Sequence, residues 1–408
     1  MRQVTKYNIL DSLIGGRESM IPIIRSGAMS EYSDGHAFLK ALREQHPQEN
    51  PGFSEFSRYL GRKARLQGIP LNGQFELTPL CNFRCEMCYV RLDKEQMSQP
   101  LLTPEQWNGL ISEAVEAGML HVTLSGGECL AYPGFRAVYE HVQHLGCEVE
   151  IFTNGALLDE DWIRYFKAHP PAGIHITLYG DSEDAYERVT GQRAFELVLG
   201  HIRRVLKEKL PLHLNVTPCR ALGEDVFGTI RLARELCRSV VVNHLLSQPR
   251  EETGRAQEVC DLDDDFYIRI LQFQNELDGI QMGTCPEEKL PAEGGPDPDG
   301  IRYGVLCGAG RSGFCVNWKG IMIPCNELEI VRTYPLETGF PEAWQQIREA
   351  VDHYPRASVC DGCAYEPVCE RCIGCVATFA EPGTWPHPLC ERTKRFVQQG
   401  VYPVPDCP

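Results

Sequence analysis

The sequence predicts an α/β protein in which parallel strands curve into a partial (β/α)6 barrel, with a small N-terminal α+β module before the barrel and a cysteine-rich, metal-stabilised domain after it. The first observation behind this prediction is a repeat. From Gly73 onward a short apolar strand, a turn and a helix recur about every 25 to 40 residues, which is the spacing of βα units. The second is that ten of the 19 cysteines lie in residues 305–408, where periodic apolar segments are too few for an ordinary core.

The composition is that of a folded, acidic protein. The chain has 408 residues, of which 43% are hydrophobic and 24% charged, so two or three domains with buried cores are expected. The net charge of −16 repels nucleic acid and anionic lipid, and we expect neither as a partner. No run of about 18 apolar residues and no signal peptide are found, which predicts a cytoplasmic protein. In that reducing compartment, 19 cysteines indicate metal-bound thiolates rather than disulfides.

Six strands are predicted for the barrel. Each is a short apolar run at the start of a strand–turn–helix unit, so the strands run parallel, and the loops after their carboxyl ends should carry the chemistry, as in a TIM-like barrel. The predicted strands are Gln74–Thr78, His121–Leu124, Glu148–Phe152, Ile174–Leu178, His213–Val216 and Val240–His244.

The helix between the first two strands has clear start and stop signals. Thr103 is a good N-cap residue, Pro104 suits the first helical position, and Gln106 completes a capping box with Thr103. Gly118 ends the helix in a left-handed conformation. One face is apolar and is expected to cover the sheet; it consists of Trp107, Leu110, Ile111, Ala114 and Val115.

Domain boundaries follow from changes in composition. Residues 1–72 form the N-terminal module and residues 73–285 hold the barrel. The segment 286–304 is rich in proline and glycine and is predicted to be a linker, which leaves 305–408 as the C-terminal domain. The N-terminal module combines β-like runs at Val4–Leu10 and Met20–Ile24 with helical patterns at His36–Gln45 and Phe53–Gln67.

Three cysteines follow the first predicted strand directly. Cys81, Cys85 and Cys88 have the spacing Cys-x3-Cys-x2-Cys on one short loop. Three thiolates can hold three corners of a [4Fe–4S] cube, for which the usual protein set is four, and so leave one iron open to a small ligand. A zinc site or three unrelated cysteines is the alternative.

This run resembles the signature of radical S-adenosylmethionine (radical SAM) enzymes. The resemblance implies that the open iron binds the amine and carboxylate of SAM, that one electron cleaves the sulfonium, and that the 5′-deoxyadenosyl radical removes a hydrogen atom from the substrate. It also implies a reductant such as flavodoxin or ferredoxin. The sequence departs from the family pattern at Met87, where an aromatic residue is usual.

A second family motif follows the second strand. The turn Ser125–Glu128 reads Ser-Gly-Gly-Glu and resembles the Gly-Gly-Glu motif, in which Gly126 and Gly127 let the backbone approach the ligand and the carboxylate of Glu128 meets the amino group of SAM. Cys129 stands where proline is common in the family. A plain glycine turn is the alternative.

Three later turns resemble family contacts with the nucleoside. Thr153 and Asn154 end the third strand in Thr-Asn-Gly, and Thr177 and Asn215 lie where ribose contacts are usual. Ordinary turn chemistry is the alternative reading of each.

The C-terminal cysteines resemble a SPASM domain, a C-terminal extension of radical SAM enzymes that mostly modify peptides and proteins. With the barrel, the resemblance covers most of residues 73–390. It implies two auxiliary [4Fe–4S] clusters with interleaved ligands. The first would be held by Cys307 and Cys325 together with Cys372 or Cys375, with Cys315 as a further candidate; the second would be held by Cys360, Cys363, Cys369 and Cys390. A zinc ribbon is the alternative, because Cys-x2-Cys knuckles also bind zinc.

These features predict a radical SAM enzyme that abstracts hydrogen from a ribosomally made precursor peptide or protein and installs a thioether or C–C cross-link, or a similar modification. Residues 1–72 are compatible either with a reduced leader-peptide-binding element or with an extension that caps the barrel. The alternatives are a radical SAM enzyme with a non-peptide substrate and a noncatalytic zinc-binding interaction protein on a degenerate barrel. No spacing rule identifies a general base.

Overall fold

The computed structural model describes residues 60–90, 100–243, 262–279, 304–305, 307–355 and 387–401, together with residues 363, 365, 368–369 and 372–373. Within these residues one eight-stranded sheet has the strand order β6-β5-β4-β3-β2-β1-β7-β8. The strands are β1 (Asn72–Glu76), β2 (His121–Ser125), β3 (Glu148–Thr153), β4 (Gly173–Thr177), β5 (Leu212–Val216), β6 (Val240–Val242), β7 (Gly313–Val316) and β8 (Met322–Ile323).

All six predicted barrel strands are present, and β1 to β6 pair parallel in chain order. The partial barrel predicted from the repeat is therefore confirmed. β1 begins and ends two residues earlier than predicted, and the residues after Glu76 bond to the end of β2 and to the turn that follows it. The Leu77 N–H donates to the Ser125 carbonyl at 2.9 Å, and the Gly127 N–H donates to the Thr78 carbonyl at 2.7 Å.

The sheet continues past β1 into the segment assigned above to the C-terminal domain. β7 pairs parallel with β1, and β8 returns antiparallel beside β7. Phe314 of β7 meets Phe75 of β1 edge-on, with ring centroids 5.7 Å apart, and both are buried. The barrel and the start of the C-terminal segment thus share one core.

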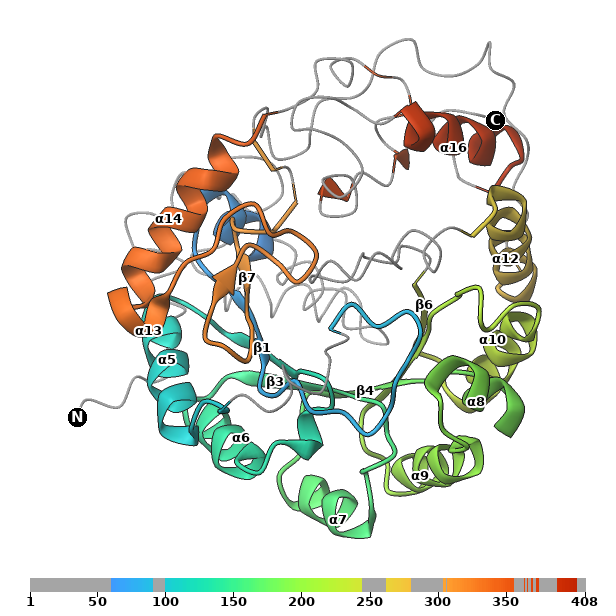
Figure 1. Cartoon of the computed structure of the whole chain (residues 1–408), viewed down its shortest axis with the longest axis horizontal. Coiled ribbons are helices and arrows are strands. Elements are labelled where there is room, and N and C mark those ends of the chain that lie inside the picture. Colours follow the sequence, from blue (N-terminus) through green and yellow to red (C-terminus); the bar gives the residue numbers. More distant parts are fainter. Residues whose placement is uncertain are drawn as a thin grey trace, which may run out of the picture.

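Helices lie outside the sheet and cover its apolar side. Figure 1 shows α5 to α10 as an arc around the strands. The capping box predicted for α5 is confirmed, since Gln106 N–H donates to Thr103 Oγ1 at 3.3 Å and Thr103 N–H donates to Gln106 Oε1 at 2.9 Å. The barrel helices are α5 (Pro104–Glu116), α6 (Phe135–His144), α7 (Glu160–Ala168), α8 (Glu183–Thr190), α9 (Phe195–Lys207) and α10 (Asp225–Leu236), with a short 3-10 helix, η2, at Cys129–Ala131.

The strands have one apolar and one polar face. Residues that face the helices are fully buried, as Val122 and Leu124 of β2 and Ile174 and Ile176 of β4 illustrate. The alternate residues face the inside of the barrel and are polar or aromatic: His121, Thr123, Glu148, Glu150, Phe152, His175, Thr177, His213 and Asn215. This alternation leaves a polar interior, where a substrate site can form.

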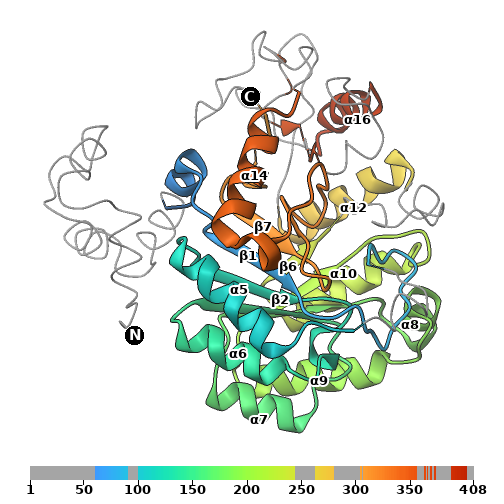
Figure 2. The same cartoon turned by 60° about the vertical axis from the view of Figure 1, so that its left-hand side comes forward.

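The C-terminal helices pack against both ends of the barrel. Figure 2 shows α14 (Phe340–Asp352) beside α5, where the Phe340 N–H donates to Glu113 Oε2 at 2.7 Å. At the other end α16 (His387–Gln398) packs on α12 (Asp264–Leu277), and Arg392 pairs with Asp264 at 2.6 Å. α13 (Pro335–Thr338) directly precedes α14.

Several predicted elements lie outside the described residues. These are the β-like runs Val4–Leu10 and Met20–Ile24, the helical pattern His36–Gln45, and the linker 286–304 except for Gly304. Residues 60–67 are helical, in agreement with that part of the pattern Phe53–Gln67. Among the described helices, none combines the length and apolar composition needed to cross a membrane.

Candidate functional site

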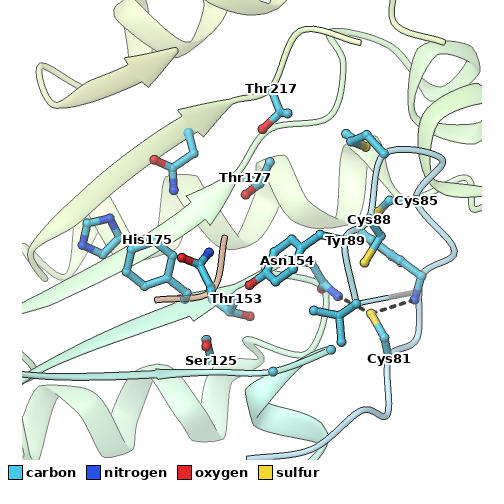
Figure 3. A pocket seen from close by; sticks show the side chains of 18 of the residues that line it. Cys81, Cys85, Cys88, Tyr89, Ser125, Thr153, Asn154, His175, Thr177 and Thr217 are labelled. Carbon is cyan, nitrogen blue, oxygen red and sulfur yellow. Dashed lines mark hydrogen bonds between the residues drawn. The ribbon is translucent and has the colours of Figure 1, made fainter. Parts of the chain in front are cut away.

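A pocket of about 750 Å³ lies at the carboxyl ends of the barrel strands. Figure 3 shows the cysteine loop on one side of it and the strand-end residues on the other. The pocket gathers nearly all of the site residues predicted for the barrel. Those that line it are Cys81, Cys85, Cys88, Gly126, Gly127, Thr153, Asn154, Thr177 and Asn215; Glu128 does not.

Backbone hydrogen bonds and an aromatic contact hold the cysteine loop in place. Its backbone bonds to the end of α8, because Arg84 N–H donates to the Thr190 carbonyl at 2.8 Å and Glu86 N–H donates to that of Val189 at 3.0 Å. Phe83 packs edge-on against Tyr179, with ring centroids 6.0 Å apart. These contacts fix the conformation of the loop, and its three thiols all lie in one pocket.

Without a bound cation, the surroundings of the three thiols disfavour the deprotonated, negatively charged thiolate. Burial raises the pKa of Cys81 to about 11. Burial also raises the pKa of Cys85, and the neighbouring Cys88 and Cys81 raise it further. Iron binding would supply the missing positive charge and displace the protons.

The donor set of the loop suits an iron–sulfur cluster. Cys81, Cys85 and Cys88 all line the same pocket. Three thiolates can each bind a different iron of a [4Fe–4S] cube and leave the fourth iron open. The residues present therefore fit such a cluster.

Gly126 and Gly127, in the turn after β2, pack closely against residues 78–80, which lead into the cysteine loop. A Cβ on Gly126, where φ is +146°, would lie 2.5 Å from the Thr78 carbonyl oxygen, and one on Gly127 would lie 2.6 Å from the Leu80 and Pro79 carbonyl oxygens. Only glycine allows the two backbones to approach so closely. The Gly-Gly-Glu motif alone did not reveal this close packing of the two glycines against residues 78–80.

The Glu128 side chain lies behind the pocket wall and is 1% exposed. Its Oε1 accepts from the Thr153 hydroxyl at 2.7 Å and from Leu130 N–H at 3.1 Å, and its Oε2 accepts from Asn154 N–H at 2.7 Å. Burial raises the pKa of Glu128, and these hydrogen bonds oppose that effect. The carboxylate thus joins the turn after β2 to the turn after β3.

The floor of the pocket contains residues that the sequence analysis did not single out. Phe152 and His175 line the pocket and stack with centroids 4.2 Å apart, and His213 on the next strand continues the stack at 4.5 Å from His175. Glu150 Oε2 lies 3.6 Å from His175 Nε2, within ion-pair range, and His175 lowers the pKa of Glu150. The available signal was the polar residue at every second strand position, which marks the inner face.

The described C-terminal cysteines form two groups. Burial is the main cause that raises the pKa of Cys325 to about 12, and the neighbouring thiols of Cys307 and Cys372 also raise it. Burial likewise raises the pKa of Cys390, and the neighbouring thiol of Cys363 raises it further. Cys369 belongs with the second group, because its Sγ accepts from the hydroxyl of Thr393, one helical turn after Cys390, at 3.7 Å.

The remaining candidates are placed differently. Cys315 lies in β7 and is fully buried. Cys360 and Cys375 lie outside the described residues. Asn326 and Glu327 directly follow Cys325 and line the barrel pocket, so the first cysteine group lies beside this pocket.

Known proteins are similar to this chain in sequence, above all in the barrel. Residues 75–233 match the family model of the Radical SAM superfamily. The chain is 27% identical over 317 residues to the AdoMet-dependent heme synthase of Methanosarcina barkeri, an alignment that covers 73% of this chain and 89% of that protein. It is 28% identical over 169 residues to the PqqA peptide cyclase of Streptomyces rochei, which covers 41% of this chain and 46% of the cyclase.

Solved structures show the same fold. The chain superposes on Streptococcus suis SuiB bound to S-adenosylmethionine with a TM-score of 0.63 at 16% identity, covering 94% of this chain and 89% of SuiB. The complex of SuiB with its precursor peptide SuiA gives a TM-score of 0.64 at 15% identity, with the same coverage.

Proposed function

We propose that the protein cleaves SAM and abstracts hydrogen from a ribosomally made peptide or protein, because residues 75–233 match the family model of the Radical SAM superfamily. The abstraction leads to a thioether or C–C cross-link, or a similar modification. A small reductant of the flavodoxin or ferredoxin type supplies electrons.

In this proposal Cys81, Cys85 and Cys88 hold a [4Fe–4S] cluster that, when bound, supplies an open iron for SAM and the electron that cleaves it. The residues of the chain bind and orient the cofactor. Thr153 ends β3 and Asn154 directly follows it, and Thr177 and Asn215 lie side by side on β4 and β5. Their hydroxyl and amide groups suit a ribose and an amino acid carboxylate.

The observation that carries the proposal is the convergence of these residues. The ends of β1, β2, β3, β4 and β5 are successively about 25 to 50 residues apart in the chain, yet residues at or just after these ends line a single pocket. Its volume of about 750 Å³ leaves room for a substrate group beside SAM. The polar floor around Gln74, Thr123 and His175 would receive that group.

A peptide substrate is favoured by the C-terminal segment. The two cysteine groups divide as an interleaved pair of auxiliary clusters would, with Cys307, Cys325 and Cys372 in the first and Cys363, Cys369 and Cys390 in the second. We assign Cys360 to the second by its knuckle spacing to Cys363. The similarity to a PqqA peptide cyclase and to the fold of SuiB, solved with its precursor peptide, supports the same class of substrate.

A non-peptide substrate is the second candidate. The heme synthase of M. barkeri aligns over 89% of its own length, much further than the peptide cyclase does. Under this alternative the same pocket would receive a porphyrin side chain. The two candidates share the barrel chemistry and differ only in what enters beside SAM.

One experiment separates these candidates. The full-length protein is purified anaerobically, assayed for iron, sulfide and zinc, and incubated with SAM, dithionite and a deuterated substrate. One arm uses the peptide encoded by a short cysteine-rich reading frame beside its gene, and the other uses a porphyrin precursor of heme. Deuterium in 5′-deoxyadenosine with the peptide alone supports the proposal, and with the porphyrin alone supports the alternative. Zinc without iron and sulfide would refute both.

A further inference from the structure

The side chain of Asn154 is fixed in one orientation by its own turn. Its Oδ1 accepts from the Ala156 N–H at 2.9 Å, and its backbone N–H donates to Glu128 Oε2 at 2.7 Å. Because a backbone N–H can only donate, the atom that faces Ala156 must be the oxygen. The Nδ2 of Asn154 therefore points the other way, toward the cysteine loop, as Figure 3 shows.

Two acceptors on the cysteine loop face this Nδ2. Asn82 Oδ1 lies at 2.7 Å and Cys81 Sγ at 3.7 Å, within range for a hydrogen bond to sulfur. Asn154 is 5% exposed, so water competes little for its two N–H groups. Cys81 Sγ also accepts from Phe83 N–H at 3.4 Å. This thiol therefore has two donors aimed at it, one of them a side chain from a different βα turn.

We propose that Asn154 donates a hydrogen bond to the Cys81 thiolate and thereby raises the reduction potential of the barrel cluster. The inference rests on the proposed function, in which Cys81 is a cluster ligand. Reduction adds negative charge that spreads onto the thiolate ligands, and a donor to one of them stabilises the reduced form more than the oxidised form. Asn154 thus makes the cluster easier to reduce before SAM is cleaved.

Glu128 is the positioning residue in this arrangement. Its side chain does not line the pocket, but it holds Asn154 N–H and the hydroxyl of Thr153. By these hydrogen bonds the carboxylate fixes the position of the turn after β3, from which the side-chain amide of Asn154 reaches Cys81 Sγ. The role of Asn154 assigned here concerns the cluster ligand and is separate from any contact with the nucleoside.

The chain offers a matched pair of variants. Asn154→Leu removes both side-chain hydrogen bonds to the cysteine loop with little change in volume. Asn82→Ala removes only the hydrogen bond between Asn82 and Asn154 and leaves the donor to Cys81 in place. Asn154→Asp is a further variant, because its carboxylate still accepts from Ala156 N–H but cannot donate to sulfur.

The test is a redox titration of the reconstituted full-length proteins followed by electron paramagnetic resonance. The barrel cluster is recognised as the signal whose shape changes when SAM is added. We expect a more negative midpoint potential in Asn154→Leu and Asn154→Asp, with iron content as in the parent, and the parental potential in Asn82→Ala.

Other outcomes overturn the inference. A parental potential in an iron-replete Asn154→Leu or Asn154→Asp variant would show that the hydrogen bond does not act on the cluster. Equal shifts in Asn154→Leu and Asn82→Ala would assign Asn154 a tethering role only. A parent protein with no SAM-sensitive cluster signal would instead refute the proposed function, and the inference with it.

Discussion

Glu128 Oε2 accepts a 2.7 Å hydrogen bond from the backbone N–H of Asn154, which joins two successive βα turns behind the pocket wall. The carboxylate is buried and also accepts from Thr153 and Leu130. A side chain that the motif suggests for the cofactor is thus occupied within the protein itself.

Glu128→Gln should destabilise the protein even without cofactors. The amide replaces one acceptor oxygen with a donor, so a buried N–H loses its partner, at a cost of about 1–3 kcal/mol. Chemical denaturation of the apoprotein measures this loss. Parental stability combined with weaker SAM binding would contradict the structural role and favour a direct contact between Glu128 and SAM.

Gly126→Ala should disturb the cysteine loop, because the new Cβ would lie 2.5 Å from the Thr78 carbonyl oxygen and the backbone has a positive φ. We expect less iron bound at the barrel site and slower SAM cleavage. Gly109→Ala is the control. Gly109 lies inside α5 with nothing within 4 Å of an added Cβ, so this variant should gain about 0.5–1 kcal/mol of stability and keep its iron. Equal iron content in the two variants would contradict the fastening role of Gly126.

Cys372→Ala should lose about four irons per chain if Cys372 completes the first auxiliary cluster. Cys315→Ala is the matched control, because that thiol is buried in β7 and should be dispensable for iron binding. Iron analysis of the reconstituted variants decides between them. Iron loss from Cys315→Ala alone would reverse the assignment.

The stability of the barrel should fall as the pH drops below neutral, in part because of His213. Burial lowers the pKa of His213, and the neighbouring His175 lowers it further, while Glu150 acts in the opposite direction. Below its ordinary value of 6.5, the unfolded chain therefore binds a proton that the folded chain does not. Stability is lost as the pH falls through this window, down to the folded pKa.

Replacement of His213 by Gln should remove that part of the pH dependence. The difference in melting temperature between pH 7.5 and pH 5.5 should be smaller in His213→Gln than in the parent. Melting curves at a series of pH values check this, and an undiminished difference would show that His213 does not titrate as described.

Local patterns in the sequence predicted much of the fold. The capping box of Thr103 and Gln106 spans three residues, and the strand alternation has a period of two, so each is visible without knowing the fold. The cysteine loop was placed for the same reason, since its three thiols lie within eight residues.

Contacts between turns could not be predicted in this way. Glu128 and Asn154 are 26 residues apart and meet only because β2 and β3 pair in one particular register. The partners of Gly126 and the separation of Cys372 from Cys369 likewise depend on how distant segments pack. Pairing of β7 with β1, which extends the barrel sheet, links residues about 240 positions apart, and no local pattern reveals it.

The central claim is that Cys81, Cys85 and Cys88 hold the cluster that cleaves SAM. The direct measurement is 5′-deoxyadenosine formation from SAM and dithionite, under anaerobic conditions, by the parent and by the variant with all three cysteines replaced by Ala. The account predicts that the variant loses about four irons, keeps its auxiliary iron and makes no 5′-deoxyadenosine. Formation of 5′-deoxyadenosine by the triple variant at the parental rate would contradict it.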